Sequence, residues 1–263
     1  MRFTPMFMQR NSNSARCCFC VAIIVTSLVV AGCARTASKT EMVVDGSAGD
    51  GPAQGMIRAS RGRLAPVYAP LAEFIVGELD LADRDGVGID VGSGPGTLII
   101  ELAKRTKHHW INADIDSNVF AHFHETAGMN GLGGRVSSIR ADVHELPFRD
   151  GYADVIVSRG SYHFWKDKVK AFNEIYRVLK PGGVAFIGRG FSPNLAVETA
   201  REIRAGQGKS MEYSFAEKSE ELTGIMQEVG VARYKIHDPS EAHGNAVNYG
   251  IWAEFHKPPR SQQ

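Results

Sequence analysis

Three aspartates mark the ends of apolar, strand-like runs, and their type and spacing suit the binding of a nucleoside. Asp90 lies in the run Val87–Val91, Asp114 ends the next such run, and Asp142 follows a third. A carboxylate at the end of a second strand, about 20 residues beyond a glycine turn, can accept hydrogen bonds from ribose hydroxyls. Each aspartate taken singly could equally cap a helix or lie in a solvated loop. Their common position at strand ends favours binding.

A glycine-rich turn, "GIDVGSGPGTL" at residues 88–98, includes the first of these strand ends. Gly92, Gly94 and Gly96 stand between a strand and a helix, where glycine permits a tight turn and a close approach of the backbone to a ligand. The dinucleotide fingerprint would require glycine in place of Thr97, and no G-K-[ST] follows. The turn therefore argues against a P-loop, although alone it is compatible with an ordinary strand-to-helix connection.

Apolar runs and helical periodicity alternate along the chain. Strands are expected at Val87–Val91, His109–Ala113, Val136–Ile139, Ala153–Val157 and Val184–Gly188. Helices are expected before, between and after them, at Leu64–Leu79, Pro95–Arg105, Asp116–Asn130, Lys166–Leu179, Leu195–Ala205 and Phe215–Val229. Strands separated by helices predict a mostly parallel sheet with helices on both faces.

The last two strand-like runs, Val231–His237 and Val247–Phe255, are joined by a loop without a helix. Such neighbours pair as an antiparallel hairpin. We therefore expect an α/β fold with a doubly wound, seven-stranded sheet that is mostly parallel and ends in an antiparallel hairpin strand. Ligands bind such sheets outside the carboxyl ends of the strands, where the aspartates and the glycine turn lie.

All four cysteines lie within the first 33 residues, so the rest of the chain has no disulfide, thiolate metal site or cysteine nucleophile. His122 and His124, two residues apart, do not share a helix face, and no metal site is expected. The formal net charge is +1 without a basic block in the domain, which predicts no nucleic-acid partner.

The N-terminus has the pattern of an export signal. Three arginines precede the apolar run Cys17–Val30, which is shorter than the roughly 18 to 20 residues that span a bilayer. Val30–Cys33 resembles a bacterial lipobox, which implies lipidation of Cys33 and anchoring to a membrane of the cell envelope. The alternative is a misassigned start codon, with Met42 or Met56 as the true first residue and a cytoplasmic protein.

These observations divide the chain into four parts. Residues 1–33 are a signal sequence with a lipobox, and residues 34–55, small and polar, form a flexible linker. Residues 56–259 form one domain, long enough to bury a large core, and residues 260–263 are a tail.

Four stretches of the domain occur in an order known from one family: "VGIDVGSGPGTL", "INADIDSNVF", "ADVHELPFRDGYADVIVSRGSYHFW" and "EIYRVLKPGGVAFIG". Over Leu64–Lys257 the chain resembles the class I S-adenosylmethionine-dependent methyltransferases, especially the small-molecule group that includes the ubiquinone/menaquinone methyltransferases. The resemblance implies a Rossmann-like fold, S-adenosyl-L-methionine as the cofactor, and transfer of its methyl group.

The resemblance also implies roles for the matching positions. Asp90 would face the methionine ammonium of the cofactor, and Asp114 would hold both ribose hydroxyls. Asp142, with the backbone of Val143, would contact the adenine edge. The other implied cofactor contacts are Gly92, Gly94 and Gly96, along the methionine and ribose, and Ser158, beside the transferable methyl group.

On the acceptor side, the resemblance points to Arg159 and His163 as catalytic candidates. Arg159 stands where the family often has a small polar residue, and it either recognises an anionic acceptor or pairs with a nearby acid. His163 either takes a proton from the acceptor, for which its ordinary pKa is suited, or packs in a loop. Tyr68 is a candidate for closing over the cofactor, and Phe191–Phe215 is either a lid or a surface helix.

The sequence thus predicts an S-adenosylmethionine-dependent methyltransferase that acts on a small, unidentified acceptor, with lipophilic compounds among the candidates. One alternative is a catalytically inactive, lipid-anchored protein that keeps the fold, since S-adenosylmethionine is made in the cytoplasm. A further alternative, an NAD(P)-dependent dehydrogenase, is disfavoured by Thr97 and by the terminal hairpin.

Overall fold

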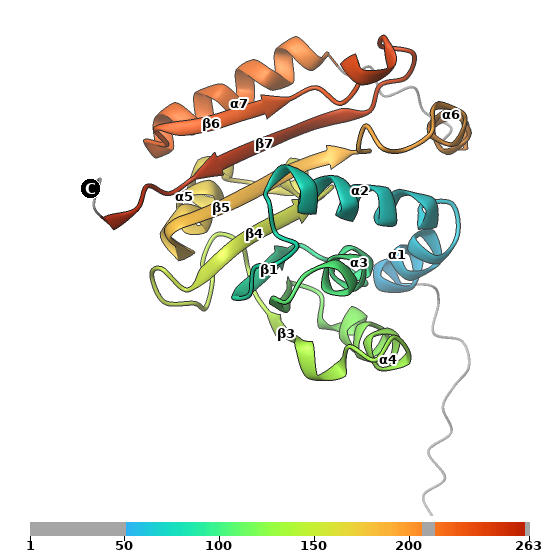
Figure 1. Ribbon diagram of the computed structural model, residues 1–263, viewed down its shortest axis with the longest axis horizontal. Helices are drawn as coiled ribbons and strands as arrows, with labels where there is room; N and C mark the ends of the chain where they lie inside the picture. Colours follow the sequence, from blue (N-terminus) through green and yellow to red (C-terminus); the bar gives the residue numbers. More distant parts are fainter. Residues whose placement is uncertain (1–50, 207–213, 261–263) are drawn as a thin grey trace, which may run out of the picture. The chain divides into compact units, whose positions relative to one another are not determined.

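The computed structural model describes residues 51–206 and 214–260 (Figure 1). The export signal with Cys33, the linker up to residue 50, residues 207–213 of the segment considered as a lid, and the last three residues lie outside the described residues. None of the helices within the described ranges is long and apolar enough to cross a membrane.

The described strands form one seven-stranded sheet in the order β3-β2-β1-β4-β5-β7-β6 (Figure 1). Their bounds are β1 Val87–Val91, β2 His109–Asp114, β3 Val136–Arg140, β4 Ala153–Arg159, β5 Leu179–Gly190, β6 Arg233–His237 and β7 Gly250–His256. The first five strands pair in parallel, and β7 runs antiparallel to both of its neighbours, β5 and β6. The expected doubly wound, mostly parallel sheet with an antiparallel terminal strand is confirmed.

The chain crosses the sheet once in mid-course. It proceeds outward from β1 through β2 to β3, then returns to place β4 on the other side of β1. The carboxyl ends of β1 and β4 therefore adjoin at the point where strand order reverses. Open α/β sheets bind their ligands at this point.

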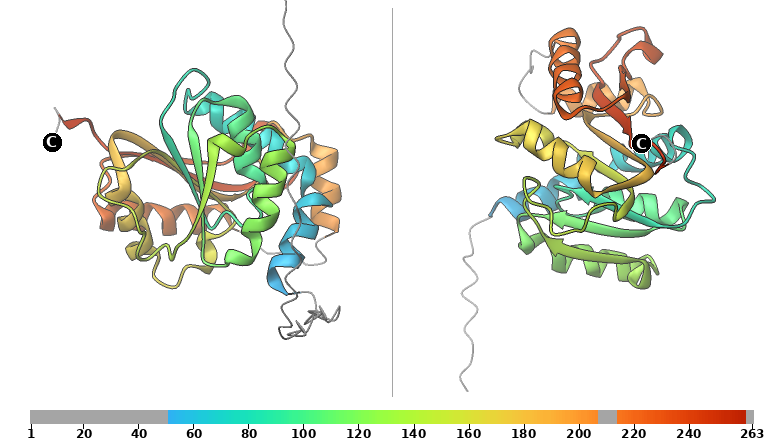
Figure 2. Two further views of the ribbon diagram at one scale, coloured as in Figure 1. Left: turned by 90° about the horizontal axis from the view of Figure 1, so that it is seen from below. Right: turned by 90° about the vertical axis from the view of Figure 1, so that its left-hand side faces the viewer.

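Helices cover both faces of the sheet (Figure 2). Their bounds are α1 Pro52–Arg61, α2 Ala65–Glu78, α3 Thr97–Arg105, α4 Phe120–Met129, α5 Lys168–Val178, α6 Val197–Ala205 and α7 Phe215–Val229. Short 3₁₀ turns stand at Ser117–Val119, Gly133–Arg135, Tyr162–Phe164 and Glu241–His243. On one face α2, α3 and α4 pack around Trp110 and Phe186, and on the other α5 and α7 pack around Ile89 and Ile156. This two-sided burial explains why the central strands are nearly continuous apolar runs, while the edge strands β3 and β6 are more polar.

α1 (Pro52–Arg61) was not expected from the sequence. It takes in the end of the predicted linker and begins before Met56, where we placed the start of the domain. Its sequence is polar, and only Ala53, Ile57 and Ser60 are buried. Such a narrow stripe is too weak to stand out as helical periodicity.

β5 begins at Leu179, earlier than expected. The Lys-Pro-Gly-Gly sequence at residues 180–183 does follow the end of α5 at Val178, as a stop signal should. These residues nevertheless extend the strand, through a shift of register opposite Ala153 and Val155. Lys180 Nζ also pairs with the Asp154 carboxylate at 2.6 Å.

The turn before α3 is shaped by a contact with α4. Gly96 is the N-cap of α3 and has left-handed dihedrals (φ 71°, ψ 17°), so α3 begins at Thr97 and not at Pro95. A Cβ atom at Gly96 would lie 2.2 Å from Cδ2 of the fully buried Phe123. Only glycine therefore fits between the turn and α4.

We expect Gly96→Ala to destabilise the protein by about 1–2 kcal/mol through its backbone conformation and by a further ~1–3 kcal/mol through the overlap with Phe123. Gly131→Ala is the matched control, since Gly131 has a similar φ of 70° but no atom within 4 Å of the added Cβ. Denaturant unfolding measures both. Equal losses in the two variants would show that Phe123 does not restrict the turn.

Candidate functional site

Two side chains of β2 hold the glycine turn in place. Asp114 accepts hydrogen bonds from the backbone N–H of Gly94 (2.7 Å, to Oδ2) and of Asp116 (2.9 Å, to Oδ1). Asn112 Nδ2 donates to the carbonyl oxygen of Gly94 at 3.0 Å. Both side chains are buried, so each peptide group of Gly94 is fixed by an inward-facing group of the neighbouring strand.

The three turn glycines serve different purposes. A Cβ at Gly92 would lie 2.6 Å from Cβ of Ser161, so Gly92, like Gly96, is required by the packing of the protein itself. At Gly94 the added Cβ would meet only Sδ of Met56 on α1, at 3.6 Å. Gly94 is therefore the turn glycine beside which a ligand finds room, with α1 next to it.

Asp90 is a buried carboxyl group at the switch point. Its Oδ2 accepts a hydrogen bond from Ser93 Oγ at 2.8 Å, while Oδ1 is shielded from water and has no partner among the described residues. Burial raises the pKa of Asp90 to about 7. The neighbouring Asp114 adds to this rise, and the hydrogen bond from Ser93 and the charge of Arg159 oppose it. A cation bound beside Asp90 would stabilise the ionised form of this buried carboxyl group.

Arg159 and Tyr68 lie against each other beside Asp90. The guanidinium carbon of Arg159, the last residue of β4, is 5.1 Å from the centre of the Tyr68 ring on α2. Burial raises the pKa of the Tyr68 hydroxyl and lowers the pKa of Arg159. The structure thus brings three sequence-predicted residues together from α2, β1 and β4.

Unpartnered buried polar atoms concentrate at this edge of the sheet. Within residues 51–206 and 214–260, six buried side-chain atoms have no hydrogen-bond partner. Five of them lie in the last residues of β1, β2 and β4 or shortly after β4 and β5: Asp90 Oδ1, Asn112 Oδ1, Arg159 Nε, His163 Nδ1 and Ser192 Oγ. Since buried polar groups are normally satisfied, this edge is built for a polar ligand.

Comparison with known proteins identifies the family. A family model described as a methyltransferase domain matches residues 89–187, from β1 to β5. The crystal structure of a candidate S-adenosyl-L-methionine-dependent methyltransferase from Methanococcus maripaludis is 33% identical to the chain. It aligns over 79% of this chain and 93% of that one, with a TM-score of 0.68. The chain belongs to the class I S-adenosylmethionine-dependent methyltransferases.

Two further relatives extend the comparison. The ubiquinone/menaquinone biosynthesis C-methyltransferase of Vibrio parahaemolyticus is 29% identical over 171 residues, which are 57% of this chain and 66% of that protein. The chain spans about two thirds or less of the curated relatives it matches. Phosphoethanolamine N-methyltransferase 2 of Haemonchus contortus, in complex with phosphomonomethylethanolamine and S-adenosylhomocysteine, shares the fold at 16% identity. That match has a TM-score of 0.57 and covers 81% of this chain and 59% of that one.

S-adenosylmethionine is the cofactor of this methyltransferase, and the site fits it. Its ammonium and ribose hydroxyls are hydrogen-bond donors, and its sulfonium is a cation. The site offers acceptors that lack partners, Asp90 Oδ1 and Asn112 Oδ1, together with the carboxylate of Asp114.

Asp142 and Val143 follow β3 at the same edge of the methyltransferase sheet. The Asp142 side chain is 53% exposed, and its Oδ1 accepts hydrogen bonds from the backbone N–H (2.9 Å) and Nδ1–H (2.6 Å) of His144. These bonds hold the pKa of Asp142 below its ordinary value. His144 Nε2 in turn accepts from the backbone N–H of Asp167, at the start of α5. The sequence points to Asp142 but not to His144, which orients it.

Ser158 does not have the surroundings expected of a cofactor contact. It is fully enclosed, with 0% of its surface exposed, and its hydroxyl donates to the carbonyl oxygen of Val91 at 2.7 Å. Ser161 bonds to the same carbonyl at 3.1 Å and to the Ser158 hydroxyl. Ser158 therefore ties β4 to β1 through its side chain, and its expected contact with the cofactor stays a prediction.

His163 is a poorer base than the sequence suggested. Burial, together with the charges of Arg189 and Lys168, lowers the pKa of His163 to about 4. The imidazole is therefore neutral at pH 7 and accepts a proton only weakly, so its ordinary pKa does not apply here. Its ring lies 3.9 Å from that of Phe164, whose side chain is 76% exposed.

Several residues of the site were missed from the sequence. Asn112 stands inside an apolar strand and could have been noticed as a polar interruption. Ser161 and Ser192 carry no signal, because serine is common in loops. Ile115 is exposed next to Asp114, where an apolar side chain can cover a flat base.

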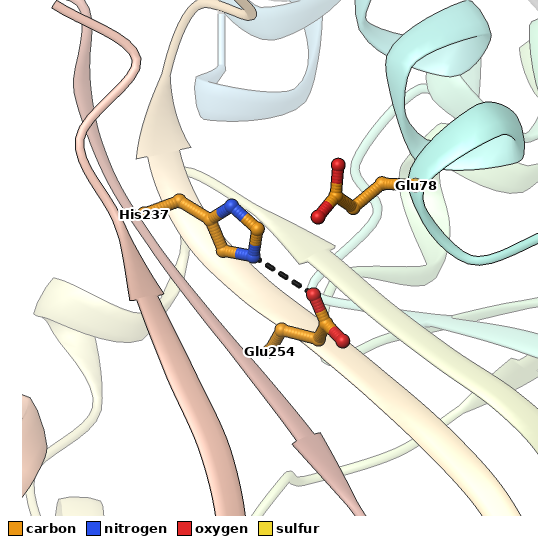
Figure 3. A group of neighbouring side chains, drawn as sticks. All are labelled: Glu78, His237 and Glu254. Atoms are coloured by element: carbon orange, nitrogen blue, oxygen red, sulfur yellow. Dashed lines mark hydrogen bonds and ion pairs between the residues drawn. The ribbon is translucent and has the colours of Figure 1, made fainter. Parts of the chain in front are cut away.

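A separate group, Glu78, His237 and Glu254, joins α2 to the β6–β7 hairpin (Figure 3). Its possible metal-ligating atoms lie within 4.8 Å of one another, although no metal site is predicted from the sequence. His237 Nε2 donates to Glu254 at 2.8 Å, His256 Nε2 bonds to the other oxygen of Glu254 at 2.7 Å, and Lys235 pairs with Glu78 at 2.7 Å. Burial acts to raise the pKa of Glu254, but the hydrogen bonds with His237 and His256 lower it to about 2. Each member thus has a partner, and the group is explained as an ion-pair network.

Asp90→Asn should stabilise the cofactor-free protein at high pH. The pKa of Asp90 lies near 7 in the folded state, against an ordinary value of 3.8, so its burial costs stability as pH rises from about 4 to 7. An amide does not titrate. We expect the variant to gain about 1–3 kcal/mol at pH 8 and much less at pH 4.

Thermal unfolding at several pH values measures this difference. Asp83→Asn is the control, because that side chain is 99% exposed, and we expect it to leave the stability curve unchanged. A stability difference between wild type and Asp90→Asn that does not vary with pH would contradict the assignment of a raised pKa.

Proposed function

We propose that the protein transfers the methyl group of S-adenosylmethionine to a small-molecule acceptor. The observation that carries this proposal is the row of unpartnered polar atoms along the carboxyl ends of β1, β2, β4 and β5. The similarity to ubiquinone/menaquinone C-methyltransferases makes lipophilic compounds candidates for the acceptor. The acceptor itself is not identified by this similarity, because the chain aligns with only part of those proteins.

In this proposal, separate strands hold separate parts of the cofactor. Asp90 faces the methionine ammonium, Asp114 accepts from the ribose hydroxyls, and Asp142 with the backbone of Val143 contacts the adenine. Ile115 covers one face of the base. Asp114 has the lone pairs for this task, since a carboxylate can accept about four hydrogen bonds and two are made by the turn.

The bound cofactor supplies a methyl group that is already activated by its sulfonium. The protein contributes mainly by orienting acceptor and cofactor in line, which can supply on the order of 7–11 kcal/mol. The N–H and the carbonyl of Gly94 are both hydrogen-bonded to side chains of β2, so this part of the site is rigid enough to orient a bound cofactor.

His163 is not proposed as a general base. With its pKa near 4, it would contribute little to proton abstraction at neutral pH. It instead forms part of the acceptor wall with Phe164, and the proposal requires an acceptor that reacts without giving a proton to His163.

Asp114→Asn should weaken S-adenosylmethionine binding about 10- to 100-fold, because charge-assisted hydrogen bonds contribute about 1.5–3 kcal/mol. Calorimetric titration of the full chain measures the affinity, and a parallel titration with NAD tests the dehydrogenase alternative. Asp83→Asn, on an exposed loop, is the control.

Unchanged affinity in folded Asp114→Asn would mean that the ribose lies elsewhere. A folded wild-type protein that binds neither S-adenosylmethionine nor NAD would favour the inactive alternative.

We further propose that the protein is lipid-anchored at Cys33. This proposal is supported by residues 1–33, in which basic residues, an apolar core and a lipobox follow one another in the order of a lipoprotein signal. Intact mass of the protein made in a bacterium that processes lipoproteins should show a chain that starts at Cys33 and carries more than one acyl chain, since one chain anchors only marginally. Cys33→Ser should abolish this species. A full-length or Met-started, unmodified wild-type protein would refute the anchor.

A further inference from the structure

Arg159 differs from the other arginines whose bonds are described. Arg84, Arg105 and Arg177 each pair with a carboxylate at 2.6–2.9 Å. Arg159 makes no hydrogen bond or ion pair with any residue in the described ranges, and its Nε is shielded from water. The guanidinium carbon of Arg159 lies over the ring of Tyr68, 5.1 Å from its centre. The terminal nitrogens therefore remain available to a ligand.

Asp90 is the acid whose charge acts on Arg159, but it is not in direct contact with the guanidinium. It forms no ion pair with Arg159, and its Oδ2 is engaged by Ser93. With a pKa of about 7, Asp90 is also only partly ionised at neutral pH. The sequence left open whether Arg159 pairs with a nearby acid, and the geometry removes that alternative. A partly buried and unpaired cation lowers stability, a cost that is offset when a ligand supplies the anion.

The surroundings of Arg159 favour an anion over a neutral group. The charges of Arg189 and Lys168, added to burial, lower the pKa of His163, which follows Arg159 by four residues, although Lys168 is itself paired with Glu221. A guanidinium presents a rigid fork of donors that matches a carboxylate or phosphate group. Its contact with Tyr68 limits the orientations of that fork.

We propose that Arg159 binds a carboxylate or phosphate group of a ligand in this site, and that the methyl acceptor carries this group. The inference rests on the proposed function. Arg159 ends β4, on the opposite side of β1 from Asp114, whereas the nucleoside is assigned to β2 and β3. The methionine carboxylate of the cofactor has the same chemistry, and the experiment must separate the two sources.

The first arm of the experiment tests the cofactor as the source. The full chain is titrated with S-adenosylmethionine and with its decarboxylated analogue, using wild type, Arg159→Gln and Arg149→Gln. Arg149 is the matched control, an exposed arginine 6.0 Å from the ring of Tyr152 and outside the site. We expect Arg159→Gln to bind S-adenosylmethionine within about threefold of wild type. A loss of tenfold or more that is absent for the decarboxylated analogue would overturn the assignment to the acceptor.

The second arm tests the anion. Protein saturated with S-adenosylhomocysteine is titrated with inorganic phosphate and with benzoate at constant ionic strength, and the melting temperature is followed. We expect a saturable rise in wild type and Arg149→Gln, and an apparent Kd at least tenfold weaker in Arg159→Gln. Arg159→Lys keeps the charge but not the planar fork of donors, and its apparent Kd should lie between those of wild type and Arg159→Gln. No saturable response in wild type, or equal responses in all variants, would refute the proposal.

Failure of the proposed function is distinguishable from failure of this inference. If wild type binds no S-adenosylmethionine, the proposed function fails. The anion titration of the cofactor-free protein then still decides whether Arg159 is an anion receptor. Circular dichroism of Arg159→Gln verifies that any lost response does not come from unfolding.

Discussion

The site depends on one carboxylate that binds the backbone of its own chain. Asp114, at the end of β2, accepts the N–H groups of Gly94 and Asp116. It therefore fixes the turn after β1 and the entry to the next helix with a single buried side chain. Because the turn is held before any ligand arrives, little ordering remains to be done on binding, and loss of this anchor would disturb every group along the edge.

Charge is divided across the switch point between β1 and β4. Asp90, Asp114 and Asp142 lie on the β1–β3 side, where a sulfonium and an ammonium must be accommodated. Arg159 lies on the other side, at the end of β4. One sheet edge thus presents opposite potentials to its two ligands, which would favour each ligand in its own half.

The sequence predicts the elements better than the surroundings of single side chains. The central strands follow from apolar runs because both of their faces are buried, whereas the edge strands β3 and β6 are more polar and only partly buried. Helix α1 was missed because only a narrow stripe of it is buried. Position at a strand end could not reveal that Ser158 is enclosed. The pKa of His163 is lowered first by burial and then by the charge of Arg189, 26 positions along the chain, and neither can be read from a local motif. The ion pair between Glu78 and Lys235 likewise could not be predicted from a sequence motif, because the two residues are far apart in the chain.

The place of β7 in the sheet has a consequence for the order in which the chain acquires its structure. β7 (Gly250–His256) is the last strand of the sequence described, yet it lies inside the sheet, paired with β5 along 184–190 and with β6 along 233–237. Until those residues emerge from the ribosome, β5 has an open edge and β6 has no neighbour. A nascent or truncated chain would therefore expose two unpaired edges, a state prone to aggregation. Such a chain completes its sheet only after β7 has been synthesised, and until then it remains a suitable substrate for chaperones.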